Sequence, residues 1–174
     1  MRHIVIIGLF ISTMLNGQQH KIHYLLTTDP EEVKLIDTVL TDFVENDSIL
    51  LLYNPFQPLV DYYLGITWSF PNKCYTVSLN GGLKPGDVKK FVLLHELGHV
   101  LDICFGDLQQ YPPMWKDKPI DTRTPWAERP WEQSADKWAM RLWNRYFDTD
   151  PPIEVLDMRK AKEMKDCLNI MRNK

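Results

Sequence analysis

The most constraining stretch of this chain is an apolar run from Phe91 to Leu101 that contains two histidines and a glutamate. If the run is helical, His95 and His99 lie one turn apart, so both imidazoles can bind one metal ion. Glu96 projects beside them. This is the H-E-x-x-H pattern, in which two neutral imidazoles hold zinc and the glutamate is the general base toward a water that zinc activates. The run therefore predicts a buried helix that carries part of a zinc site.

Two further considerations favour a metal over a surface helix that carries two histidines by chance. Two imidazoles and a carboxylate buried without partners would cost on the order of several kcal/mol. In addition, Gly98 weakens the helix by about 1 kcal/mol relative to alanine. A glycine at this position is better explained by a neighbouring element that packs closely against it, so we expect such a neighbour.

Length and charge limit the classes of protein to consider. The chain has 174 residues, of which 44% are hydrophobic and 25% charged, and its formal net charge is −3. This length is most simply one domain with a real core. The balance of charges provides no basic surface for phosphates, so nucleic acid is not the expected partner.

The N-terminal residues 1–17 have the pattern of a possible signal peptide. A short basic start precedes an apolar segment of about a dozen residues that begins at Ile4, and the small residue Gly17 offers a cleavage position, although Leu15 fits poorly before it. The segment is too short to span a membrane comfortably. We expect a secreted or extracytoplasmic protein, without a stable membrane span once the peptide is removed, in which residues 18–174 form a single domain. The alternative is a cytoplasmic protein with a buried first strand.

A strand and a capped helix are predicted next. His20 to Thr28 alternates and then becomes apolar, as a strand entering a sheet does. Asp29 is placed to cap the following helix, Pro30 fits its first turn, and Glu32 has the position that a capping box requires. One face of that helix is apolar and consists of Val33, Ile36, Leu40, Phe43 and Val44.

Three further strands are expected before the metal helix. Ser48 to Tyr53 is short and apolar and is ended by Asn54-Pro55, which predicts a buried strand. Val60 to Trp68 and Lys73 to Leu79 are rich in β-forming residues and are separated by turn residues, which predicts a hairpin.

The second hairpin strand leads directly into the metal helix. We therefore hypothesise that Tyr75 to Leu79 lies at the edge of the sheet, where its backbone groups could pair with an extended peptide. The metal helix itself is expected to begin near Asp87 and to end before Gly106, which suits a left-handed helix terminus.

The segment from Asp107 to Pro130 is rich in proline and aromatic residues and shows no helical or strand period. We expect a long loop, which is either one wall of a substrate cleft or a simple surface wrap. Helices are predicted again at Trp131 to Phe147 and from Asp150 to about Met171. No disulfide framework can be derived from the three cysteines, Cys74, Cys104 and Cys167.

A catalytic zinc site normally takes three protein ligands, so a third ligand is needed. The chain has five histidines and none follows His99, while the other three, His3, His20 and His23, lie far upstream. The third ligand is therefore a carboxylate or a cysteine. The pattern H-E-x-x-H-x-x-G-x-x-H is excluded because Asp102 and Phe105 occupy its last two positions, and Asp102 is expected to cap or pair locally.

Glu132 is the best candidate for the third ligand. It lies one turn before Asp136, so one carboxylate can bind zinc while the other accepts a hydrogen bond from a ligand histidine. The alternatives that remain open are Glu128 and Asp136 itself as the ligand, and a solvated helix face on which neither carboxylate binds metal.

These motifs resemble those of the gluzincin metallopeptidases. The run Glu132-x-x-Ala135-Asp136-x-Trp138-Ala139 is similar to the second motif of the ImmA/IrrE-type H-E-x-x-H domains, and the resemblance covers the two short motifs. It implies an α+β, zincin-like domain: a small mixed β-sheet, an active-site helix and a helical C-terminal part. It further implies that His95, His99 and Glu132 bind Zn²⁺, that Glu96 is the base, and that Asp136 orients a ligand histidine.

The expected function is zinc-dependent hydrolysis of a protein or peptide substrate. The alternative is a catalytically inactive zincin-fold binding or regulatory protein. A residue that stabilises the oxyanion cannot be placed by pattern; Tyr111 and Tyr146 are candidates. A rival resemblance is to the peptide deformylases, which have a cysteine ligand upstream of H-E-x-x-H as Cys74 is here, but the other motifs of that family are missing.

Overall fold

The computed structural model describes residues 21–24, 29–44, 49–57, 64–121, 123–152 and 155. The possible signal peptide, Cys167 and all but the start of the predicted last helix lie outside the described residues. Helices and strands mix along the described chain, which confirms the α+β class. In chain order they are β1 Lys21–Tyr24, α1 Pro30–Phe43, β2 Leu50–Gln57, β3 Gly65–Phe70, β4 Cys74–Asn80, α2 Asp87–Cys104, β5 Leu108–Gln110, β6 Pro113–Trp115, β7 Lys118–Pro119, the 3-10 helix η1 Trp126–Glu128 and α3 Pro130–Tyr146.

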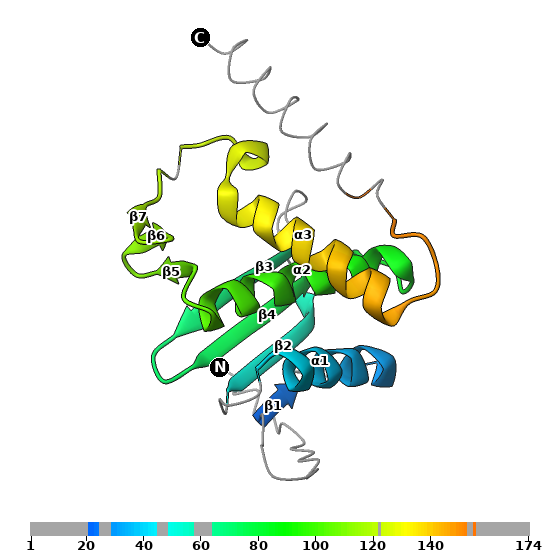
Figure 1. Cartoon of the computed structure of the whole chain (residues 1–174). Helices are drawn as coiled ribbons and strands as arrows, with labels where there is room; N and C mark the ends of the chain where they lie inside the picture. The colour runs from blue at the N-terminus through cyan, green and yellow to red at the C-terminus, as the bar shows by residue number, and fades with distance from the viewer. Residues whose placement is uncertain are drawn as a thin grey trace, which may run out of the picture.

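The larger sheet is mixed, as predicted, with the strand order β1-β2-β4-β3 (Figure 1). Strands β1, β2 and β4 are parallel, and β3 runs antiparallel to β4 as the other half of the predicted hairpin. The hypothesis that Tyr75 to Leu79 forms the sheet edge is wrong. Both edges of β4 are paired, one with β2 and the other with β3, so β3 takes the outer position beside the metal helix.

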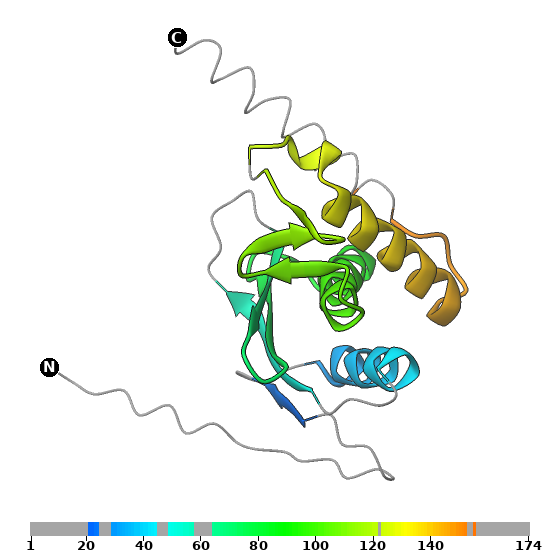
Figure 2. The same ribbon diagram turned by 60° about the vertical axis from the view of Figure 1, so that its left-hand side comes forward.

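Helices α1 and α2 cover one face of this sheet, and α3 packs on the far side of α2 (Figure 2). Alternate side chains of β2 and β4 enter the core beneath the helices, because successive residues of a strand point to opposite faces. The buried residues of these two strands that belong to the hydrophobic core are Leu51, Tyr53, Tyr75, Val77 and Leu79.

Helix α2 lies between the sheet and α3, and every residue from Phe91 to Asp102 is buried. This position explains why the sequence is apolar around the whole helix. The helix ends before Gly106, which has a φ of +81°, as predicted. Although α2 is apolar, neither it nor any other helix within the described ranges has the length and apolar character needed to cross a membrane.

The close neighbour expected at Gly98 is helix α3. A Cβ atom added to Gly98 would lie 2.9 Å from Cβ of Trp138 and 3.1 Å from Cα of Ala135. Since α3 also carries Glu132, the glycine lets the two helices approach closely enough for ligands on both to meet.

Asp29 caps α1 as predicted, and its carboxylate accepts a hydrogen bond from the backbone N–H of Glu31 at 2.9 Å. The capping-box role of Glu32 is wrong. Its carboxylate is buried, accepts a hydrogen bond from the hydroxyl of Tyr53 at 2.7 Å and pairs with the ammonium of Lys89 at 2.7 Å. The side chain therefore joins α1 to both β2 and α2.

The sequence predicted that β2 ends at Asn54-Pro55. The strand instead continues through these two residues to Gln57. The register with β4 shifts between Asn54 and Gln57. A proline has no N–H group to donate to the ladder, so a local irregularity of this kind accommodates it within a strand.

The proline-rich segment contains secondary structure that the sequence analysis missed. Strands β5, β6 and β7 form a small antiparallel sheet, and η1 follows it (Figure 1). Lys116 and Asp117 turn the chain between β6 and β7 with φ angles of 48° and 62°. Strands of two or three residues are too short to produce a visible period, which is why the pattern did not reveal them.

Candidate metal centre

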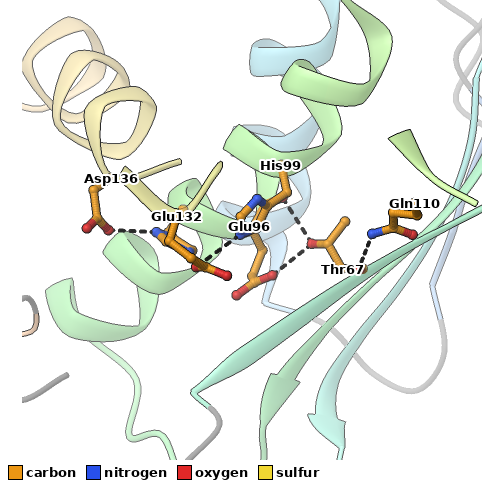
Figure 3. Close-up of polar contacts among 7 residues, drawn as sticks. Thr67, Glu96, His99, Gln110, Glu132 and Asp136 are labelled. Atoms are coloured by element: carbon orange, nitrogen blue, oxygen red, sulfur yellow. Dashed lines mark hydrogen bonds and ion pairs between the residues drawn. The ribbon is translucent and has the colours of Figure 1, made fainter. Parts of the chain in front are cut away.

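Three predicted ligands meet between α2 and α3 (Figure 3). Nε2 of His95 lies 3.3 Å from Oε2 of Glu132, and Nε2 of His99 lies 3.5 Å from the same oxygen. One ligand atom from each of the three residues can be chosen so that all three atoms lie within 4.8 Å of one another. Helical spacing aligns the two histidines, and Glu132 reaches them from the first turn of α3.

The distances test whether this set fits zinc. Zinc bonds of about 2.0–2.2 Å in a tetrahedral site place neighbouring ligand atoms about 3.3 Å apart. A charge-assisted hydrogen bond between an imidazolium and a carboxylate would be shorter, about 2.7–2.9 Å. The observed separations of 3.3 Å and 3.5 Å match the spacing of ligands that share one ion, and they are at the long end of hydrogen-bond distances. Two imidazoles and one carboxylate are also a donor set of catalytic zinc sites, with the fourth position left for water or substrate.

Asp136 lies on the other side of the His95 ring. Its Oδ1 is 2.8 Å from Nδ1 of His95, one helical turn beyond Glu132 (Figure 3). An N–H at Nδ1 that bonds this carboxylate leaves the Nε2 lone pair facing Glu132, the tautomer that a metal ligand requires. Asp136 is thus placed to orient His95.

The other proposed ligands lie outside this group of atoms. Glu128 is exposed on η1, and Cys74 begins β4 at the far end of the hairpin. Among the described residues, the group of three that could hold a metal consists of His95, His99 and Glu132, and it includes neither Glu128 nor Cys74. The expectation of a solvated face is also wrong for Glu132, whose side chain is 14% exposed.

The charges of the surrounding residues favour a positive charge between the three predicted ligands. Burial opposes ionisation of Glu132, but the hydrogen bonds with His95 and His99 outweigh it and hold the pKa of this carboxyl well below its usual range. Burial likewise favours a neutral His99, yet its hydrogen bond with Glu132 and the negative charges of Glu132, Glu96 and Asp102 raise the pKa of the imidazole. A cation in this position is therefore stabilised.

Glu96, the predicted base, is held by a residue that the sequence analysis missed. The hydroxyl of Thr67 lies 2.8 Å from Oε2 of Glu96 and 3.1 Å from its backbone oxygen (Figure 3). A Cβ atom on Gly65 would lie 2.5 Å from Oε1 of Glu96. On strand β3, the Thr67 hydroxyl therefore holds Oε2 of Glu96, and the absence of a side chain at Gly65 leaves space for Oε1. Nothing local in the sequence marks either residue, because both act across the gap between strand and helix.

Helix α3 is fastened to α2 by a buried carboxylate. Oδ1 of Asp102 accepts hydrogen bonds from Nε1 of Trp138 at 2.9 Å and from the hydroxyl of Ser134 at 3.0 Å. The expectation that Asp102 pairs locally is wrong, since both partners lie on α3. On η1, the ring of Trp126 stacks beside the His95 ring with 6.2 Å between the centroids.

Of the two tyrosines suggested as oxyanion stabilisers, Tyr146 is not beside the ligands. Tyr146 lies at the opposite end of α3 from Glu132 and donates a hydrogen bond to Asp42 at 2.8 Å, so this assignment is wrong. Tyr111 is 70% exposed in the turn between β5 and β6.

Comparisons with models of protein families, with curated proteins and with solved structures find no match for this chain. Two imidazoles and a carboxylate can bind zinc between α2 and α3, and a second carboxylate lies beside them on α2. This combination can bring together a metal, a base and a water.

Proposed function

We propose that the protein is a zinc-dependent metallopeptidase with a zincin-like fold and a gluzincin-like ligand set. The observation that carries this proposal is the spacing of the His95, His99 and Glu132 ligand atoms, together with the Glu96 carboxylate held beside them. The mixed sheet with an antiparallel outer strand next to the metal helix supports the zincin-like assignment. The proposed substrate is a protein or peptide.

In this proposal, His95, His99 and Glu132 would hold zinc, and the bound metal would supply a water of lowered pKa and an electrophile for the scissile carbonyl. Glu96 accepts the proton of the attacking water and delivers it to the leaving amine. Thr67 bonds Oε2 of this carboxylate, so Oε1, the oxygen next to Gly65, is the atom that exchanges the proton. Asp136 keeps the His95 imidazole in the orientation that the metal needs.

Removal of the metal tests this function. We expect the purified chain to contain a stoichiometric amount of zinc and to cleave peptides in a proteome-derived library, as detected by mass spectrometry. A chelator should abolish cleavage and added zinc should restore it. Cleavage that persists without metal would contradict the mechanism. Bound zinc without any cleavage would instead favour the non-enzymatic binding protein.

Substitution of Gly65 by alanine tests the position of the base. The new Cβ would meet three atoms of the buried Glu96 side chain, Oε1 at 2.5 Å, Cγ at 2.6 Å and Cδ at 2.8 Å, so this side chain must move as a whole. We expect kcat, measured well below the Tm of the variant, to fall at least about tenfold, because catalysis depends on the position of the base. Gly82→Ala is the matched control, since among the described residues its Cβ would meet Oδ1 of Asn80, at the longer distance of 3.3 Å. Equal kcat values for the two variants would refute the role of Gly65.

A further inference from the structure

Strand β3 is the outer strand of the sheet on the side of the metal helix. Its even-numbered residues direct their backbone groups toward β4, as the carbonyl of Leu64 does in accepting a hydrogen bond from the N–H of Asn80 at 2.9 Å. Because these groups alternate along a strand, the outward N–H and C=O groups belong to Gly65, Thr67 and Ser69. An extended peptide that adds to this edge would pair with them.

The side chain of Gln110 already occupies part of this edge (Figure 3). Its Nε2 donates to the carbonyl of Thr67 at 3.0 Å, and its Oε1 accepts from the N–H of Ser69 at 2.7 Å and from the Ser69 hydroxyl at 3.1 Å. The backbone donor and acceptor together fix which end of the carboxamide is oxygen. One side chain thus makes the two backbone hydrogen bonds that a residue of an added strand would make.

The contact between Gln110 and β3 lies next to Glu96, the proposed base. Thr67 offers its carbonyl to Gln110 and its hydroxyl to Glu96, so the occupied edge begins at the residue that holds the base. Gln110 ends β5, which follows α2 after a short turn, so it belongs to the same chain segment as the metal helix. The edge at Gly65, nearer the Oε1 atom of Glu96, is not bonded by Gln110.

We propose that Gln110 is a specificity-determining residue that closes the β3 edge from Thr67 to Ser69 against the main chain of a substrate. The inference rests on the proposed peptidase function. A peptide bound along β3 can pair with the strand at Gly65, but Gln110 already bonds the carbonyl of Thr67 and the N–H of Ser69. Pairing therefore stops on the side of the scissile bond where the peptide reaches Thr67. For the wild-type enzyme, we therefore expect kcat/KM to rise little when residues are added to the end of the peptide that runs toward Thr67 and Ser69. Gln110 should not affect residues added to the other end.

A length series of peptides tests this role. A peptide that the enzyme cleaves in a proteome-derived library is synthesised with stepwise extensions at its N-terminus or its C-terminus, and kcat/KM is measured for each. We expect Gln110→Ala to raise kcat/KM about tenfold for extensions on one side, because the peptide no longer competes with the hydrogen bonds of Gln110. The gain is the ratio of kcat/KM for the extended peptide to kcat/KM for the shortest one, so a change in the basal rate of the variant cancels. Gln109→Ala is the matched control, since the side chain of this exposed neighbour bonds, within the described ranges, the carbonyl of Tyr111 at 2.9 Å and not the β3 edge.

A second variant protects the test against a folding defect. Gln110→Glu keeps the size and the acceptor for Ser69 but sets a carboxylate oxygen against the Thr67 carbonyl, so we expect a smaller gain for the same peptides. An equal loss for short and long peptides in both variants would make Gln110 a structural support and overturn the proposal. Unchanged length dependence would also overturn it, while leaving the peptidase function intact. If the wild type cleaves no peptide, the proposed function fails and this inference fails with it.

Discussion

A Glu96→Gln variant is expected to lose peptide hydrolysis by about a hundred- to ten-thousand-fold in kcat while it still binds zinc. The amide has nearly the shape of the carboxylate and can still accept the hydrogen bond from Thr67, but it cannot take a proton from water. The proposed metal ligands are His95, His99 and Glu132, and Glu96 is not among them, so we expect the zinc content not to change. Peptide cleavage by mass spectrometry and metal analysis of the same sample measure both quantities.

The matched control for this substitution is Glu31→Gln. Glu31 pairs with Lys90 at 2.9 Å on the surface of α1, and its side chain is 73% exposed. Its loss should leave both hydrolysis and zinc content unchanged. If Glu96→Gln retained the wild-type kcat, Glu96 would not be the base, and the hydrolysis would have to be assigned to another group.

The residues that the sequence identified lie on two helices with regular spacing. His95 and His99 are one turn apart, and so are Glu132 and Asp136, so each pair shares a face before any tertiary contact is known. The pairing of Asp136 with His95 follows the same logic, because a buried ligand histidine needs an acceptor for its other nitrogen. What the sequence left open was the choice of third ligand, and the structure brings Glu132 to the two histidines.

The residues that the sequence missed lie on β3 and β5. Thr67, Gly65 and Gln110 act on groups that are 29 or more positions away in the chain, and none belongs to a periodic pattern. Their roles depend on which strand is outermost, and the sequence analysis had placed the edge at Tyr75 to Leu79. Strand order is set by long-range pairing, so a strand next to the metal helix in sequence need not lie at the edge.

The variant Glu132→Ala is expected to lose both zinc and hydrolysis. Two histidines alone form an incomplete site, and the carboxylate also supplies the negative charge that stabilises a cation between them. The fold should persist, because Asp102 still ties α2 to α3 through Ser134 and Trp138. Metal analysis and peptide cleavage measure the loss. Thermal unfolding with and without added zinc gives a second readout, since only a protein that binds zinc in its native state is stabilised by it.

Glu128→Ala is the control that separates the two candidate ligands. Glu128 is four residues earlier and exposed on η1, so its removal should change neither the zinc content nor the rise in Tm on adding zinc. The reverse result, with Glu132→Ala binding zinc normally and Glu128→Ala losing it, would mean that η1 moves inward to complete the site. Glu132 would then be a hydrogen-bonding partner of the two histidines in the metal-free protein, and the ligand set proposed here would be wrong.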